Sequence, residues 1–303
     1  MKQQPPLTVP SSVEVLRADK EVLPNGVALY TLPAEEFEVL RATFVFHAGS
    51  SVQQVPFSAS ATANLLAEGT QGRSAREIAE QLDYYGSWFD VNLDRDYAYI
   101  SFATLSKFCR ETLGVAEEIL LRPTFPEEEL RTYCAKRRQR LQIDRRKVDV
   151  EAREAFARAL FGEHHPYGIA YDEALYDTLT REDVQRFYRT HYTAENCFVV
   201  CSGRITEEVR AAVAAIAGQL PHGERAQGDF PAPETRAELR VAHPGAVQSS
   251  IRIGRLLFDR LHPDFVGMQV VATLLGGYFG SRLMQNLRER HGYTYGVVSA
   301  MVN

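Results

Sequence analysis

The sequence predicts an α+β fold in which helices cover a mostly antiparallel sheet, followed by an incomplete second copy of the same kind of domain. Three observations support this prediction. Over residues 1–220, short β-forming segments joined by tight turns alternate with amphipathic helical segments. A polar, proline-containing stretch at 221–239 is typical of a linker. In 240–303 the order strand, helix, glycine turn, helix and strand returns.

Hairpins account for the antiparallel sheet expected in the first domain. A Pro-Asn-Gly turn at 24–26 lies between two apolar arms within 13–32, and such a turn favours a hairpin. A run of β-forming residues predicts a strand at 39–46. Two further strands flank an Asp-Arg-Asp turn at 94–96, and another strand is expected at 196–202.

Helices are expected where a capping signal precedes apolar residues at helical spacing. Ser74 and Glu77 form a capping box, and Thr180 with Asp183 forms a weaker one. Pro126 is expected at the first position of a long helix, which has an acidic first turn and runs on through a basic stretch. The other predicted helices are 58–68, 107–121, 206–219, 263–275 and 281–290.

The part after the linker is too short for a complete second domain. Its predicted strands are 247–253 and 295–302, around the two helices already given. Roughly 65 residues cannot complete a copy of a first domain of about 220 residues. We therefore expect either a truncated form of a longer protein or a partner that supplies the missing part.

Composition and charge exclude several classes of function. The chain is 45% hydrophobic and 24% charged, with a net charge of −5, which is ordinary for a globular protein and argues against a nucleic-acid partner. No apolar run approaches the ~20 residues of a membrane span, so no membrane partner is expected. Without a visible signal peptide the cytoplasm is the default location, although a periplasmic protein after removal of its signal would look the same.

Three groups of residues have an ordinary structural explanation. Cys197 and Cys201 share one face of a strand and are expected to pack in the core. His164 and His165 are expected in a packed turn. The basic stretch is interpreted as a solvated helix face, with a wall that meets an acidic peptide or a partner as the alternative. It comprises Arg131, Lys136, Arg137, Arg138, Arg140, Arg145, Arg146 and Lys147.

Eight segments in a fixed order resemble the insulinase/pitrilysin family, the inverted zinc peptidases. They include LPNGV at 23–27, HAGS at 47–50, HHPYG at 164–168 and, as the most specific, GGYFGSRLMQNLRERHGYTYG at 276–296. The resemblance covers nearly the whole chain. It implies paired α/β sandwich domains of similar fold that enclose a chamber for peptides.

The resemblance also shows where the family's zinc site would lie. Family members hold zinc with the two histidines of a His-x-x-Glu-His helix and with a later Glu, and the motif Glu activates the zinc-bound water. In this chain the motif positions fall on Ser60, Ala63 and Asn64, and the later Glu falls near 141–144, where only Asp144 is acidic. The resemblance thus implies a chain with no metal site and no catalytic residue of its own.

Arg282 and Tyr295 match an Arg/Tyr pair that the family carries in its second domain. The resemblance implies that the Arg binds a substrate carbonyl and that the Tyr stabilises the oxyanion. In this family the two halves of the site can lie on different subunits. The sequence therefore predicts a non-catalytic, Arg/Tyr-bearing subunit of a heterodimeric zinc endopeptidase, with a peptide substrate and a homologous, zinc-bearing partner subunit.

Two alternatives stay open. The chain could be an inactive homologue that serves as a peptide-binding or assembly scaffold, although a scaffold has no need of the Arg/Tyr pair. It could also be a self-sufficient hydrolase, but no nucleophile elbow, Cys/His signature or phosphate loop supports that reading.

Overall fold

The computed structural model describes residues 12, 15–226, 228, 230–233, 235 and 238–302. The chain divides into two compact units, one ending at Arg252 and the other beginning at Ile253. The predicted linker belongs to the first unit and has no helix or strand among its described residues. The domain limits 1–220, 221–239 and 240–303 stay predictions. In the described part of the chain, no helix is both long and apolar enough to cross a membrane.

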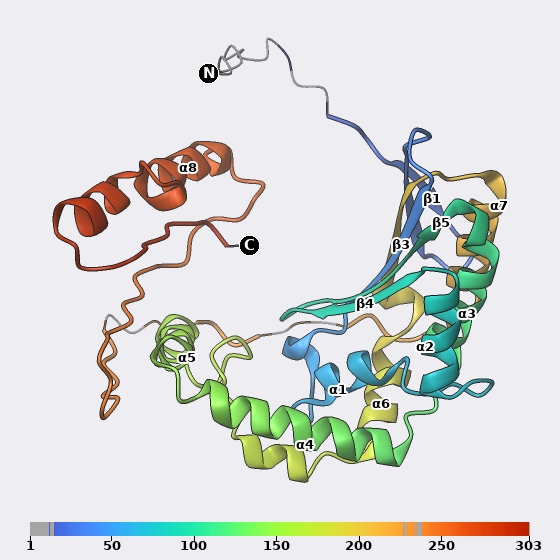
Figure 1. Cartoon of the computed structure of the whole chain (residues 1–303), viewed down its shortest axis with the longest axis horizontal. Helices are drawn as coiled ribbons and strands as arrows, with labels where there is room; N and C mark the ends of the chain where they lie inside the picture. The colour runs from blue at the N-terminus through green and yellow to red at the C-terminus, as the bar shows by residue number, and fades with distance from the viewer. Residues whose placement is uncertain are drawn as a thin grey trace. The chain divides into compact units, whose positions relative to one another are not determined.

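A single six-stranded sheet forms the centre of the first unit (Figure 1). Its strands are β1 (Asp19–Val22), β2 (Ala28–Pro33), β3 (Val39–Phe46), β4 (Trp88–Leu93), β5 (Ala98–Leu105) and β6 (Cys197–Gly203), in the order β1-β2-β6-β3-β5-β4. Strands β2 and β6 pair in parallel, and the other neighbours pair antiparallel. The predicted fold class is confirmed, as are the strands expected at 39–46 and 196–202.

The predicted turns hold the hairpins in register. Gly26 has a φ of +88°, which disfavours any residue with a side chain, and the Leu23 amide donates to the Val27 carbonyl over 2.9 Å. Between β4 and β5, Asp94 Oδ1 accepts hydrogen bonds from the backbone amides of Asp96 at 2.8 Å and Tyr97 at 2.7 Å. Both turns are thus local features that adjacent residues determine.

Helices of the first unit cover one face of the sheet, as Figure 1 shows for α1, α2, α3, α6 and α7. On β3, Leu40, Phe44 and Phe46 point into the core, whereas Arg41 on the other face is exposed. The helices are α1 (Ser58–Leu65), α2 (Ala75–Tyr84), α3 (Cys109–Leu121), α4 (Glu127–Asp144), α5 (Val148–Phe161), α6 (Arg181–His191) and α7 (Glu207–Gly218). Short 3₁₀ turns lie at Ser50–Val52, Ser106–Phe108, Glu173–Asp177 and Ala194–Asn196.

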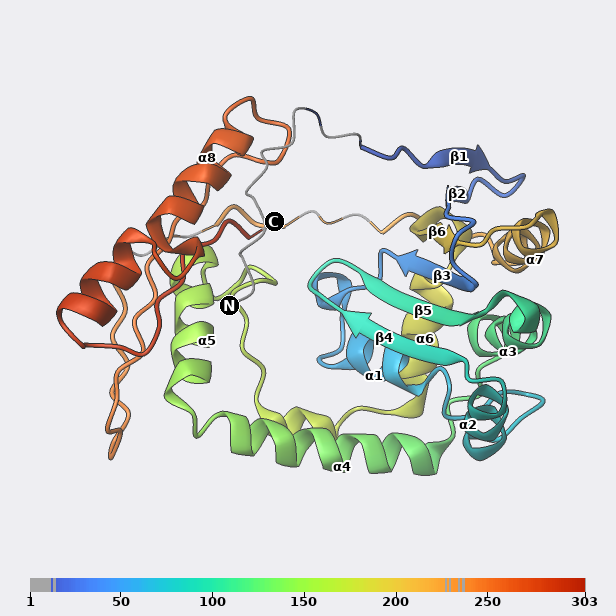
Figure 2. The same ribbon diagram turned by 45° about the horizontal axis from the view of Figure 1, so that its top comes forward.

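The prediction of one continuous helix through the basic stretch is wrong. Helix α4 ends at Asp144, and α5 begins at Val148 and turns away from α4 (Figure 2). Arg145 at the bend donates to the Tyr171 carbonyl at 2.6 Å and to Glu173 Oε2 at 2.7 Å. These partners come from a distant part of the chain, so no local signal marks the break. Pro126 is the N-cap of α4 and not its first helical residue.

The second unit is helical. Helix α8 (Phe265–Ala272) continues into a π-helical turn at Thr273–Gly277, and another π-helical segment runs from Met284 to Arg290. These match the two helices predicted there. The strands predicted at 247–253 and 295–302 are wrong for the described residues, which form no strand after Gly203. A strand needs a partner for its backbone hydrogen bonds, and no described segment pairs with either stretch.

Candidate functional site

Helix α1 carries Ser60, Ala63 and Asn64, the three residues that the sequence resemblance assigns to the zinc-motif positions. It packs against α6 and α4, and Ala63 is fully buried. Ser60 Oγ donates to the Phe57 carbonyl at 3.0 Å, and Asn64 Nδ2 donates to the Ser60 carbonyl at 2.8 Å. Both polar side chains therefore bond to their own helix, and Ala63 has no group that could accept a proton.

Helix α4 closes over this part of α1. Arg137 Nη2 donates to Asn64 Oδ1 at 3.1 Å, and its guanidinium lies 5.3 Å from the centre of the Tyr133 ring. Tyr176 stacks on Phe57 with 3.8 Å between ring centres. Burial raises the pKa of both Tyr133 and Tyr176, so neither phenol ionises near neutral pH. Aromatic rings and the hydrogen-bonded Arg137 guanidinium thus lie around the zinc-motif positions.

The donor set does not fit zinc. A zinc site takes about three protein ligands from Cys, His, Asp or Glu, and no group of three such residues that could hold a metal lies in the described part of the chain. Asp144 at the end of α4 accepts hydrogen bonds from Lys147 Nζ at 2.7 Å and Arg140 Nε at 2.9 Å. These hydrogen bonds lower its pKa, with the Lys147 bond as the largest cause. Its carboxylate is therefore engaged in ion pairs of its own.

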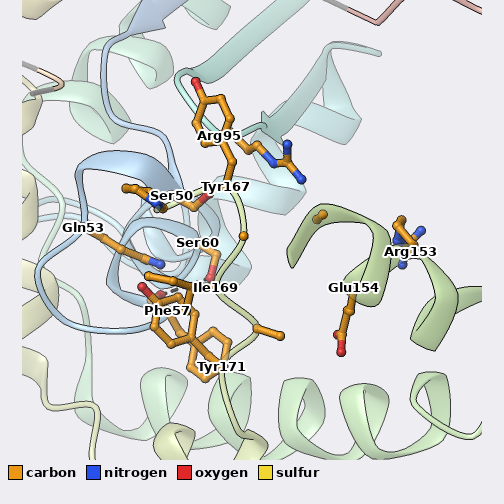
Figure 3. Close-up of a pocket in the computed structure, with 14 residues that line it drawn as sticks. Ser50, Gln53, Phe57, Ser60, Arg95, Arg153, Glu154, Tyr167, Ile169 and Tyr171 are labelled. Carbon is orange, nitrogen blue, oxygen red and sulfur yellow. Dashed lines mark hydrogen bonds between the residues drawn. The ribbon is translucent and has the colours of Figure 1, made fainter. Parts of the chain in front are cut away.

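A cavity of about 280 Å³ adjoins α1 at Ser60 (Figure 3). Its walls come from α1 and the segment before it, from the β4–β5 turn, from α5 and from the loop that contains HHPYG and the three residues after it. Arg95 and Arg153 line it, although the sequence identified Arg95 only as part of a turn and gave no sign of Arg153. His165 is buried in the same loop, as expected for a packed turn, with its ring 5.1 Å from that of Phe161.

Arg282 and Tyr295 belong to the second unit, whereas Ser60, Ala63 and Asn64 belong to the first. Arg282 is exposed in the first turn of the helical segment that leads into Met284–Arg290. Tyr295 is 91% exposed in the irregular segment after it. Within the described residues neither side chain has a hydrogen-bond or ion-pair partner, so both are available to a ligand.

Comparisons with known proteins indicate which family the chain resembles. Residues 178–303, from just before α6 through the second unit, match the family model described as "Peptidase M16 inactive domain". This part of the chain therefore resembles the M16 peptidase family. This confirms the resemblance to the insulinase/pitrilysin peptidases. This M16 homologue is 25% identical over 240 residues to an uncharacterized zinc protease of Rickettsia bellii, a match that covers 77% of this chain and 57% of that protein.

One further relative and one solved structure are also similar to this chain. An uncharacterized zinc protease of Bacillus subtilis is 23% identical over 237 residues, or 78% of this chain and 58% of that protein. This M16 homologue thus spans less than two thirds of the length of both curated relatives. A crystal structure described as the peptidase M16 inactive domain from Pseudomonas fluorescens shares its fold, with a TM-score of 0.82 and 24% identity over 95% of this chain and 71% of that chain.

Proposed function

We propose that this M16 homologue is the non-catalytic, Arg/Tyr-bearing subunit of a heterodimeric zinc endopeptidase that acts on peptides. One contrast carries the proposal. The zinc-motif positions on α1 hold Ser60, Ala63 and Asn64, whose polar groups bond internally, whereas Arg282 and Tyr295 are present and have no partner among the described residues. In this proposal the chain binds no zinc, and a homologous partner subunit supplies both the metal and the activated water.

Each retained residue has a defined task in this proposal. The Arg282 guanidinium has five N–H donors, which can hold a peptide carbonyl of the substrate in place. The Tyr295 hydroxyl can donate a hydrogen bond to the carbonyl oxygen as the carbon becomes tetrahedral and negative charge develops. Tyr295 contributes to the chemical step, whereas Arg282 contributes to both substrate binding and alignment.

The test is peptide cleavage by this chain mixed with a homologous subunit that carries His-x-x-Glu-His. Tyr295→Phe should lower kcat by about 10²–10³-fold, the usual cost of removing one oxyanion donor. Arg282→Ala should also raise KM. Tyr293→Phe is a matched control, because Tyr293 is exposed in the same segment and its ring stacks on His291 at 5.1 Å.

Two further measurements complete the test. Size-exclusion chromatography should show that all variants assemble equally, and elemental analysis should find zinc only with the partner. Wild-type cleavage rates in both Tyr295→Phe and Arg282→Ala would contradict the Arg/Tyr role and favour the scaffold alternative. The isolated chain should bind no zinc. If it bound one zinc ion and lost it on substitution within 60–64, the proposal that α1 has no zinc site would be contradicted.

A further inference from the structure

The cavity beside α1 has charged residues on one side and uncharged residues, several of them apolar, on the other. Figure 3 shows Arg95 above the cavity, Arg153 and Glu154 on the right, and Gln53, Ser60 and Phe57 on the left. Ile169 and Tyr171 add to the apolar side. Its volume of about 280 Å³ is at the small end of small-molecule sites, which span roughly 300–1,000 Å³. It therefore suits one or two residues of a longer chain.

Both arginines of the cavity lack a carboxylate partner among the described residues. Among the described residues, the Arg153 side chain has no ion pair or hydrogen bond, and the Arg95 guanidinium has cation–π contacts with aromatic rings but no ion pair. The acidic neighbours are occupied elsewhere. Glu154 lies 3.8 Å from Arg145 Nε, and the Asp96 carboxylate accepts from Ser51 Oγ and Tyr167 Oη. Both arginines thus line the cavity without a direct carboxylate contact among the described residues, although Asp96 and Glu154 lie nearby.

The cavity is held in shape before any ligand arrives. Tyr167 Oη donates to Asp96 Oδ1 at 2.5 Å, which ties the HHPYG turn to the β4–β5 turn. The Arg95 guanidinium lies 5.0 Å from the Tyr167 ring centre and 5.5 Å from that of Phe161, so cation–π contacts orient it. A preorganised guanidinium loses little freedom on binding, which favours the ligand.

One neutral donor faces the same space. Gln53 Oε1 accepts from the Ala59 amide at 3.3 Å at the start of α1, and its Nε2 has no partner among the described residues. That amide group can add one hydrogen bond to the two arginines. The combination of guanidinium donors, an amide donor and apolar rings is suited to a carboxylate attached to an apolar body.

We propose that this cavity binds a carboxylate of a peptide, between Arg95 and Arg153, with the adjoining residue of the peptide against Phe57 and Tyr171. The inference rests on the proposed peptide-handling function, because the cavity adjoins α1 at Ser60. The carboxylate comes either from an acidic side chain or from the C-terminus of the peptide. In both cases the ligand is acidic, which agrees with the basic character of the α4–α5 region.

The experiment is fluorescence anisotropy of labelled peptides with the full chain. Three probes separate the sources of the carboxylate: the amidated peptide Ala-Ala-Leu-Phe-Glu-Ala-Ala, the same peptide with Gln for Glu, and the Gln peptide with a free C-terminus. At least one carboxylate-bearing probe should bind about 10- to 100-fold more tightly than the neutral probe, as expected for charge-assisted hydrogen bonds. The carboxylate-bearing probe that binds more tightly shows whether the carboxylate comes from a side chain or from the C-terminus.

Variants locate the site. Arg153→Gln should remove most of the preference for the carboxylate-bearing probe. Arg95→Gln should do the same. Because Arg95→Gln also removes the contacts with Phe161 and Tyr167, circular dichroism should check that this variant is folded. Arg146→Gln is the matched control, because Arg146 is also exposed and unpaired but lies outside the cavity. It should leave the preference unchanged.

Two results would overturn the proposal: equal affinity for neutral and acidic probes, or equal weakening by Arg153→Gln and Arg146→Gln. Equal affinity would remove the carboxylate site and leave the Arg/Tyr subunit role untouched. Conversely, a carboxylate preference that depends on Arg153, together with wild-type cleavage by Tyr295→Phe and Arg282→Ala, would contradict the subunit role and leave the carboxylate site in place.

Discussion

At the scale of single residues, His191 shows how burial controls charge. It is the last residue of α6, its ring packs 4.4 Å from that of Phe187, and its buried Nδ1 has no hydrogen-bond partner in the described part of the chain. Burial, and secondarily the nearby His47, lowers its pKa from 6.5 to about 4. The folded protein therefore holds His191 neutral at pH values where the unfolded chain binds a proton.

This shift predicts a loss of stability in mild acid. Between pH 6.5 and pH 4 only the unfolded state protonates His191, so the free energy of unfolding should fall as the pH falls through this window. Allowing for partial solvent screening, the contribution should be about 1–2 kcal/mol. Urea titrations of wild type and His191→Gln at pH 7 and pH 4.5 measure it. The variant should lose less stability than wild type, whereas His164→Gln, an exposed control, should not differ from wild type.

The zinc-motif positions show a different residue-scale effect. Ser60 and Asn64 are polar side chains on a largely buried helix, and each bonds to a backbone carbonyl of the same segment. Arg137 supplies the remaining partner of Asn64 from α4. The chain itself thus satisfies the polar groups at these positions, where a buried group without a partner would cost about 1–3 kcal/mol.

At the scale of elements, capping determines where α6 begins. Thr180 Oγ1 accepts from the Asp183 amide at 3.2 Å, and Asp183 Oδ2 accepts from the Thr180 amide at 3.0 Å. The helix matters for the candidate site because Thr62 of α1 donates to the Val184 carbonyl at 3.2 Å. A weaker α6 would loosen the support of α1.

Thr180→Ala should therefore lower the free energy of unfolding by about 1 kcal/mol, the usual cost of losing an N-cap side chain. Urea denaturation at neutral pH provides the measurement. Thr132→Ala offers a matched control, since Thr132 is exposed in the middle of α4 and caps nothing; alanine there should be neutral or slightly stabilising. Equal losses in the two variants would argue against the capping role.

At the scale of the whole molecule, the two units differ in what they bury. The first unit has a sheet and one continuous core that includes Phe44, Ile100 and Val199. In the second unit Gly276, Ser281 and Met284 are the buried residues among those described. The intervening stretch has no helix or strand among its described residues from 221 to 264, so few backbone hydrogen bonds protect it.

Limited trypsin digestion should therefore cut first after the exposed residues Arg240, Arg252 or Arg255. Mass spectrometry should find a lasting fragment that contains β1 to α7. The basic stretch of α4 is an internal control, because it offers exposed sites such as Arg131 and Lys136 within a regular helix. Initial cleavage in α4 would contradict the division into two units.

The sequence by itself determined the features that neighbouring residues control. The Gly26 turn, the Ser74–Glu77 capping box and the alternation of β3 follow from local sterics, hydrogen bonds and side-chain periodicity, and the structure contains all three. The resemblance to the family could also be predicted, because it depends on the order of short motifs. The zinc-motif positions stay predictions. The roles of Arg282 and Tyr295 stay predictions.

Only the tertiary structure decided the features that depend on residues far apart in the chain. The break between α4 and α5 follows from Arg145 bonding to Tyr171 and Glu173, and the cavity gathers Gln53, Arg95 and Arg153 from three separate segments. The predicted strands at 247–253 and 295–302 do not form because a strand depends on hydrogen bonds to a partner. Local sequence sets the propensity of a segment for helix or strand, but long-range contacts decide whether the segment forms that structure.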